Sequence, residues 1–415
     1  MKIAYPLLGR IGRSLLGGMI LFGFAATTAQ AQIADDLETL LTDGKVKLDV
    51  RYRFEFVSDD LTPQNANAST VRTRLGFLTG NLRGLQGYVE MENTSAIFAN
   101  SYNVPGASPH GPNKPGRAIV ADPEFTELNQ VWAQYTGPKN TVLRGGRQRV
   151  KLDNDRFIGN VGWRQNEQTY DAITLNTDVL PQTHIFYGYF FRANTILGTN
   201  RDMNSHIINV RFSGLPYSQV VAYAYLLDFD PGMGTDSRTF GVRFSGAAPV
   251  GEDFKVIYWA EYANQGDYQD SADFSADYLR LELGGSYRGV TIKGGYELLG
   301  SDGGTAAFQT PLATLHAQNG WADRFLATPA AGLEDFYAVV STKISRVKMA
   351  FIYHDFSADK GGGGYGQEID VVATTKIHKR VTFGLKFAAY NADNAGAGPV
   401  NNDVQKFWTW LGLKF

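Results

Sequence analysis

Apolar and polar side chains alternate along one short segment after another of this 415-residue chain. From Val46 to Phe56, apolar or aromatic residues occupy every second position and charged residues occupy the positions between them. Successive side chains of a β-strand point to opposite faces, so such a segment has one apolar face and one charged face. Comparable segments recur as far as Phe415, and the pattern predicts about eighteen strands.

The connections between the predicted strands alternate between short and long. Short links at 79–84, 137–140 and 176–183 alternate with long ones at 93–123, 153–167 and 193–204, and the link at 300–331 is also long. This alternation is typical of an outer-membrane barrel with short periplasmic turns and longer extracellular loops. An even number of strands closes the sheet and leaves no unpaired edge in lipid. The predicted fold is an all-β, transmembrane antiparallel up-and-down β-barrel of about 18 strands.

Composition excludes several other classes of protein. The chain has no cysteine, which excludes a disulfide scaffold and zinc sites built on thiolates. Basic and acidic residues number 39 and 41, so no overall positive field would attract nucleic acid. A large secreted β-sandwich or propeller is the alternative fold, but no repeat of blade length is present in the sequence.

Residues 1–31 have the pattern of a secretory signal peptide. Lys2, Arg10 and Arg13 precede a short apolar run at 15–26, and Ala29-Gln30-Ala31 provides a small-x-small cleavage site. The run is shorter than the ~20 residues that a membrane-spanning helix needs. We therefore expect cleavage near Ala31 and localisation in the bacterial outer membrane.

Residues 32–45 form a leader before the barrel, which we place at 46–415. Ile33, Leu37, Leu40 and Leu41 have helical spacing. The leader is interpreted either as a short periplasmic helix that caps or plugs the barrel, or as an ordered segment without that role.

The strand face opposite the apolar one is expected to line the lumen, and it carries more basic than acidic side chains. Rings of Arg and Lys in a pore favour anions. Paired Arg and Glu residues that only stiffen the barrel wall are the alternative interpretation. The expected pore-lining arginines on regular strands are Arg51, Arg53, Arg72, Arg74, Arg243 and Arg280.

Four tryptophans occupy positions whose side chains point inward on the predicted strands. They are suited either to stacking against sugar rings or to the aromatic girdles that barrels place at the membrane interfaces. These residues are Trp132, Trp259, Trp408 and Trp410.

The segment 144–167 loses its alternation and becomes a polar loop that contains glycine. We expect it to fold inward and to narrow the pore, and an exposed loop with weak internal salt bridges is the alternative. The expected constriction residues are Arg144, Arg147, Arg149, Arg156 and Arg164, supported by the carboxylates of Asp153, Asp155 and Glu167.

The same region resembles the alginate-export family of outer-membrane porins. The similar motifs are GRQR at 146–149 and LDNDRFIGNVGWRQNEQTYDA at 152–172, together with DVRYRFEFV, ASTVRTRLGF and GLQGYVEMEN in the first three strands. The resemblance extends from about Lys45 to Phe415. It implies an eighteen-stranded monomeric barrel and export of a polyuronate through an arginine-lined pore. It also implies lumenal or constriction roles for Arg72, Arg74, Arg147, Arg149 and Arg156.

The functional hypothesis is a channel that passes anionic solutes passively, most specifically an alginate-like polyuronate or an acidic sugar. A general uptake porin for small anions or oligosaccharides is the alternative within channels. A surface adhesin with a sealed lumen and an outer-membrane hydrolase are the alternatives of other classes. The six histidines have no metal-binding spacing, so we expect no enzyme activity, cofactor or metal. The expected partners are outer-membrane lipid and lipopolysaccharide, an anionic polysaccharide or sugar, and the barrel-assembly machinery, which would recognise Phe415.

Overall fold

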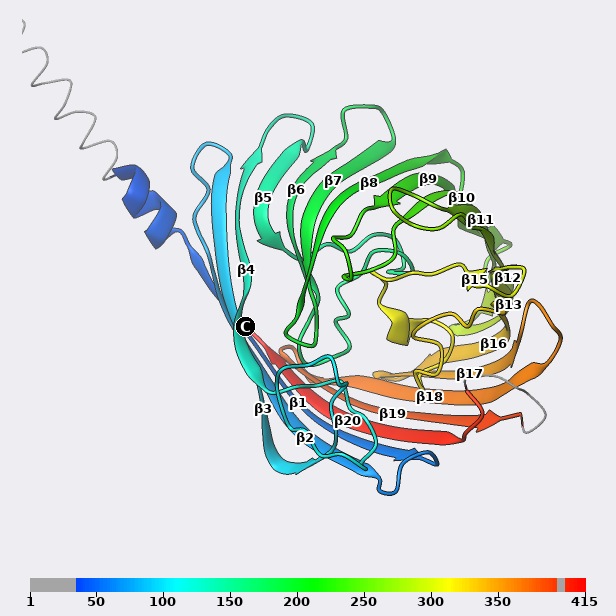
Figure 1. The fold of residues 1–415 in the computed structure, drawn as a ribbon. Helices are drawn as coiled ribbons and strands as arrows, with labels where there is room; N and C mark the ends of the chain where they lie inside the picture. Colours follow the sequence, from blue (N-terminus) through cyan, green and yellow to red (C-terminus); the bar gives the residue numbers. More distant parts are fainter. Residues whose placement is uncertain (1–34, 394–399) are drawn as a thin grey trace, which may run out of the picture.

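The computed structural model describes residues 35–393 and 400–415, which form an eighteen-stranded antiparallel barrel (Figure 1). A helix at 35–42 precedes the barrel. Two short strands, β14 (Ser301–Asp302) and β15 (Ala306–Ala307), and a 3-10 turn (Leu315–Ala317) lie in the connection between β13 and β16. The barrel strands are β1 (Lys45–Asp59), β2 (Ala66–Leu78), β3 (Leu85–Ser101), β4 (Phe125–Thr136), β5 (Val142–Gln148), β6 (Thr169–Thr177), β7 (Thr183–Asn194), β8 (Asn200–Leu215), β9 (Ser218–Leu227), β10 (Ser237–Val250), β11 (Phe254–Gly266), β12 (Ser275–Tyr287), β13 (Val290–Leu299), β16 (Leu333–Ile344), β17 (Val347–Ser357), β18 (Gly364–His378), β19 (Val381–Ala392) and β20 (Val404–Lys414).

The sheet closes because the first strand pairs with the last. β1 pairs with β2 on one side and with β20 on the other, where Tyr52 lies opposite Leu411. Every other strand pairs with its neighbours in chain order. The predicted fold class is therefore confirmed, because the alternation of side chains located the strands correctly.

The two faces of the wall differ as the alternation predicts. On β2, Arg72 and Arg74 are buried, whereas Leu75, which points to the opposite face of the strand, is 56% exposed. Leu281 and Leu283 on β12 are also exposed on the outside, while Glu282 between them is buried. The outer face is thus apolar and suits lipid, and the polar face is directed into the barrel.

The connections at one end of the barrel are short and most of those at the other end are long. One predicted long loop is short, because the link between β7 and β8 covers only 195–199 rather than 193–204. The β7–β8 ladder continues past a bulge between Phe190 and Arg192, and Asn194 still pairs with Asn200. A bulge lets one strand carry an extra residue without ending the ladder, and the sequence alternation does not reveal it.

The helix at 35–42 packs on the β2–β3 turn, where the Gly80 amide donates to the Leu40 carbonyl over 2.9 Å. It lies outside the ring of strands and does not plug the lumen (Figure 1). No helix within 35–393 or 400–415 is both long and apolar enough to cross a membrane. The proposed signal peptide at 1–31 and its cleavage site lie outside the described residues.

Gly146 on β5 has a backbone conformation that requires glycine. Its φ is +121°, and a Cβ atom there would lie 2.3 Å from the Val131 carbonyl oxygen on β4. We expect Gly146→Ala to destabilise the barrel by at least ~1–3 kcal/mol, the usual cost of a strained backbone conformation. Heat-modifiable gel migration of the refolded protein measures the change. Gly145→Ala is the matched control, because a Cβ there would meet no atom within 4 Å, and equal effects of the two variants would contradict this prediction.

Candidate functional site

The connection between β5 and β6, residues 149–168, crosses the interior and binds the opposite wall. Arg51 on β1 donates hydrogen bonds to the carbonyl oxygens of Gly162 (3.2 Å) and Trp163 (2.9 Å) and to the Gln165 side chain (2.9 Å). Gln165 in turn donates to the Thr70 hydroxyl on β2 over 2.8 Å. The inward fold that the sequence predicted for this segment is thus built from hydrogen bonds to two wall strands.

The connection between β13 and β16, residues 300–332, meets the first connection inside the barrel. Ile158 and Leu312 form a parallel β-bridge, and the Thr314 amide donates to the Asp155 carbonyl over 2.9 Å. Beside this junction, Phe157 packs against Tyr223 and Tyr278 of the wall. Both connections lie within the ring of strands in Figure 1 and act as one internal partition.

Buried ion pairs attach this partition to the wall. The Arg164 guanidinium contacts Glu55 on β1 at 3.1 Å and Asp323 at 2.7 Å, so it joins both connections to one strand. Arg156 lies 3.1 Å from Glu297 on β13. Removing one member of such a pair leaves an uncompensated buried charge, which is strongly destabilising. These arginines therefore hold the partition in place.

Asp153 and Asp155 have different partners. Asp153 accepts from Arg211 (3.0 Å) and Arg243 (2.8 Å), and these two guanidinium groups keep the pKa of its carboxyl below the ordinary value although burial opposes them. Asp155 pairs with Lys151 at 2.9 Å rather than with an arginine. Burial raises the pKa of Asp155.

Glu167 ends the β5–β6 connection and lies in a buried cluster of basic side chains. It pairs with Arg149 and with Arg74, and it accepts from Asn129 and Asn160 over 2.7 Å each. Burial alone would raise the pKa of this carboxyl. The guanidinium groups of Arg74 and Arg149 overcome that effect and lower its pKa from 4.5 to about 2.

Lys386 on β19 contacts both connections through aromatic rings. Its ammonium lies 3.6 Å from the ring centroid of Trp321 and 4.3 Å from that of Trp163. It also lies 2.7 Å from Nε2 of His316, whose Nδ1 lies 2.7 Å from Asp323. Burial keeps the pKa of His316 well below its ordinary value. The neutral imidazole thus accepts from Lys386 and donates to Asp323.

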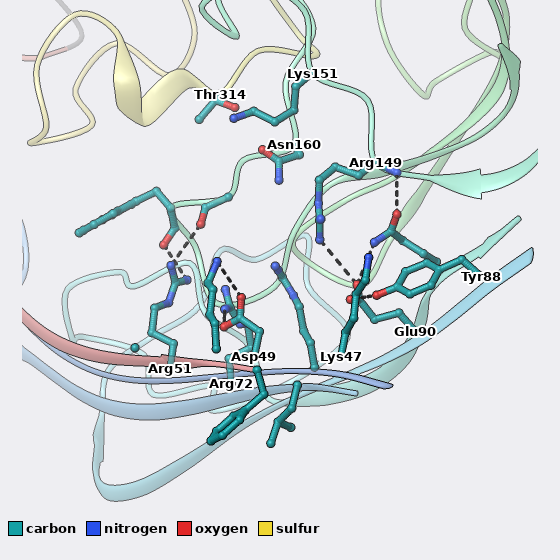
Figure 2. Close-up of a pocket in the computed structure, with 18 of the residues that line it drawn as sticks. Lys47, Asp49, Arg51, Arg72, Tyr88, Glu90, Arg149, Lys151, Asn160 and Thr314 are labelled. Carbon is teal, nitrogen blue, oxygen red and sulfur yellow. Dashed lines mark hydrogen bonds and ion pairs between the residues drawn. The ribbon is translucent and has the colours of Figure 1, made fainter. Parts of the chain in front are cut away.

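A cavity of about 890 Å³ lies between residues of the partition, such as Asn160 and Thr314, and wall residues near the start of β1, such as Lys47 (Figure 2). Eight basic and three acidic side chains line it. The basic residues are Lys47, Arg51, Arg72, Arg74, Arg144, Arg149, Lys151 and Lys414, and the acidic ones are Asp49, Glu90 and Asp155.

Three of these basic residues have no carboxylate within 4 Å among the described residues. They are Lys47, Arg51 and Arg144. The Arg51 guanidinium donates hydrogen bonds to backbone carbonyl groups, whereas the Lys47 ammonium lies 5.2 Å from the centroid of the Tyr88 ring. Arg144 donates to the Gln134 side chain and lies 4.1 Å from the Trp132 ring centroid. Lys47 and Arg144 are therefore the cations of the cavity wall with the least compensation.

The structure does not bring every predicted residue to this cavity. Arg147 shares its strand parity with Leu143, which is 51% exposed, and it pairs at 2.7 Å with Asp171 rather than with a carboxylate of the cavity. It cannot line the constriction because Arg144 and Gln148 occupy the inward positions of β5. Arg53 is buried with Asp122 and Glu55 behind the partition.

The remaining predicted residues divide between the cavity and the wall. Arg243 and Arg280 both lie over Trp259, at 4.5 and 5.1 Å from its ring centroid. Trp132 and Trp410 line the cavity. Trp408 is fully buried and packs edge-on against Trp163, so it presents no face for a sugar.

Sequence reasoning missed the second half of the partition. It identified the length of the β13–β16 connection but not its inward path. It also missed the contacts of His316 and Trp321 with Lys386 on β19 and of Asp323 with Lys406 on β20. That length was the one available signal, because a connection of this size without regular structure often has a functional role.

The fold and the internal partition define an outer-membrane β-barrel porin. Residues 44–302 match the model of a family described as "Alginate export", and the chain belongs to this family. Family and fold together point to a transport channel in the bacterial outer membrane rather than to an enzyme.

Solved structures of similar fold share little sequence with this chain. The crystal structure of Acinetobacter baumannii OccAB2 has a TM-score of 0.73 at 14% identity, covering 91% of this chain and 99% of that one. Pseudomonas aeruginosa OpdK with vanillate has a TM-score of 0.70 at 12% identity, with 91% and 99% covered. Pseudomonas aeruginosa OccK9 (OpdG) has a TM-score of 0.71 at 14% identity, with 91% and 100% covered. A search of curated proteins finds no match.

Glu167→Gln is expected to lower the stability of the barrel by ~3–5 kcal/mol, because Arg74 and Arg149 lose a buried partner. A carboxyl whose pKa is lowered on folding stabilises the protein above its unfolded pKa, and that contribution disappears as the pH falls from 4.5 to about 2. The wild type should therefore lose stability over this pH range more steeply than Glu167→Gln. Thermal unfolding in detergent across the range tests this, with the exposed Glu38→Gln as the control, and parallel pH profiles would contradict it.

Lys386→Met keeps the length of the side chain but removes its charge and its hydrogen bond to His316. We expect a loss of ~1–3 kcal/mol, as for other buried polar groups left without a partner, and faster proteolysis within 300–332. Limited proteolysis followed by mass spectrometry measures this. Lys376→Met on the neighbouring strand β18 is the control, because Lys376 is exposed. If both variants are cleaved at the wild-type rate, Lys386 does not attach the connection.

Proposed function

We propose that the protein passes anionic solutes passively through its barrel, most specifically an alginate-like polyuronate or an acidic sugar. The observation that supports this is the cavity of about 890 Å³, in which eight basic side chains face three acidic ones. An excess of one charge inside low-dielectric walls raises the local concentration of counter-ions, and basic rings favour anions.

Transport also requires release, and the distribution of charge in the cavity suits it. Asp49 pairs with Arg72 and with Lys414, and Glu90 lies 3.6 Å from Arg149. Within the described part of the chain, Lys47 and Arg144 have neither a carboxylate within 4 Å nor the backbone carbonyl partners of Arg51, and they stand on different strands. A chain of carboxylates would therefore meet several weak attractions rather than one tight site, which is the condition for conduction.

Aromatic rings beside these cations favour an acidic sugar over a simple anion. Trp132 and Trp410 line the cavity, and Trp132 lies directly beneath Arg144. A sugar carboxylate bound at Arg144 would bring the apolar face of its ring toward tryptophan. Uptake of small anions or oligosaccharides uses the same charges without this stacking, so the two hypotheses differ in whether uronate oligomers block the channel more strongly than acetate.

We also propose a cellular setting for this channel. We propose cleavage near Ala31 and a monomeric barrel that contacts lipid and lipopolysaccharide. Phe415 follows the last strand, β20; its amide donates to the Leu48 carbonyl over 2.8 Å, and the residue is 55% exposed. An exposed terminal aromatic ring is available to the assembly machinery as a recognition signal.

The reversal potential of the purified protein in a planar bilayer under a KCl gradient tests the channel. We expect chloride preference, and block when a uronate oligomer is added. Arg144→Gln should lower the chloride-to-potassium permeability ratio about fourfold, since a unit charge ~10 Å away in water contributes ~0.4 kcal/mol, and it attracts chloride as strongly as it repels potassium. Lys47→Gln should act in the same direction and add to it.

Arg147→Gln is the matched control, because it neutralises an arginine of the same strand on the opposite face. It should leave the permeability ratio unchanged. An equal effect of the two arginine variants would mean that the cavity charges do not set selectivity. A complete lack of conductance would contradict the channel and favour a sealed adhesin or a hydrolase.

A further inference from the structure

A second cavity of about 490 Å³ lies on the other side of the partition, at the end with long connections. It is bounded by the β9–β10, β11–β12 and β13–β16 connections, and its volume is in the range typical of small-molecule sites. Seven of its thirteen lining residues are apolar, including Phe274, Leu315 and Leu326. This cavity thus differs in chemistry from the basic cavity.

Arg201 is the one charged residue among those that line this second cavity. It lies near the start of β8 on the parity of Met203 and Ser205, both of which are buried inside the barrel. Within 35–393 and 400–415, no carboxylate lies within 4 Å of its guanidinium, and its side chain donates no hydrogen bond. An arginine that faces an apolar cavity without a partner is available to an anion.

The amide side chains of the cavity are occupied by the protein itself. Gln265 donates to the Thr239 hydroxyl (3.0 Å) and to the Gln309 carbonyl (2.9 Å), and its oxygen accepts from the Gln309 amide. The Gln309 side chain bonds in turn to both backbone groups of Thr328. Neither amide is therefore free for a ligand, and Arg201 is left as the charged contact, beside the hydroxyl groups of Thr235, Ser237 and Thr310.

We propose that this cavity binds a small organic monocarboxylate with a compact apolar body. The carboxylate would pair with Arg201, because a guanidinium offers two parallel donors that match its geometry. The body would lie against Phe274, Leu315 and Leu326, where burial of apolar surface is favourable. A sugar acid fits less well, because seven of the thirteen lining residues are apolar and three hydroxyl side chains, Thr235, Ser237 and Thr310, offer fewer partners than its hydroxyl groups would lose with water.

The site is tested by calorimetric titration of the full barrel in nanodiscs, with benzoate as the probe. We expect one saturable site, with weaker binding of the neutral analogue benzamide and of glucuronate. Arg201→Gln should raise the Kd for benzoate about tenfold or more, the usual effect of losing a charge-assisted pair. Because the titration needs no ion flow, its result is independent of whether the basic cavity selects anions.

Two further variants distinguish binding at Arg201 from binding at other arginines of the barrel. Arg238→Gln is the matched control, since Arg238 lies at the same end of the barrel but is half-exposed and paired with Asp267. Arg144→Gln should also leave the Kd unchanged, since it alters only the basic cavity. The proposal is overturned if Arg201→Gln binds benzoate as the wild type does, if Arg144→Gln weakens binding instead, or if glucuronate binds through Arg201 as tightly as benzoate.

Discussion

Closure of the backbone hydrogen bonds between β1 and β20 is the constraint on which the rest of this structure depends. Lipid offers no partner to a free amide or carbonyl, so a sheet that spans a membrane must have no edge. Once the sheet closes, the pleat directs alternate side chains outward and inward without exception along regular strands. The side chains that point outward must be apolar because they contact lipid. The side chains that point inward are polar, and they need partners inside the barrel.

The interior is organised by the pairing of charges between the wall and the two inward connections. Arg164 joins Glu55 of β1 to Asp323 of the second connection, and Glu167 joins Arg74 of β2 to Arg149. These buried groups are fixed by partners on two sides. They cannot also attract a passing solute, because their charge is already compensated. Arg74 and Arg149 therefore line the basic cavity with largely compensated charges, whereas Lys47 and Arg144 face it without a carboxylate within 4 Å among the described residues.

The alternation of apolar and polar residues predicted the barrel wall well and the barrel interior only in part. Alternation located the strands and assigned Arg72 and Arg74 to the inside, because a regular strand fixes the direction of each side chain. The constriction prediction failed at Arg147, because residues 144–148 continue strand β5 instead of belonging to the inward loop, and Arg147 then points to the same outer face as Leu143. Alternation failed at the β7–β8 link, where a bulge preserves pairing but shifts the apparent end of the strand.

The partners of the inward connections could not be predicted for a different reason. Trp163, Trp321 and Lys386 come from three distant parts of the chain, and their contact depends on the path of two loops. The sequence marked the β5–β6 segment by its density of arginine and acidic residues. The β13–β16 segment carries Trp321 and Asp323 among many small and polar residues, so its composition resembles that of an exposed loop.

The internal partition separates two environments of opposite chemistry. On one side, cations face a wide polar space, and their attraction extends over about a Debye length, ~8 Å at physiological salt. On the other side, Arg201 faces apolar side chains, where an ion pair is less screened but the remainder of a ligand must be apolar to enter. A polyanion and an amphipathic monocarboxylate would therefore be sorted to different sides by solvation as well as by charge. Lys386, Arg51 and Glu297 attach the partition to the wall, so under the proposed function the contacts that stabilise the fold would also keep the two classes of ligand apart.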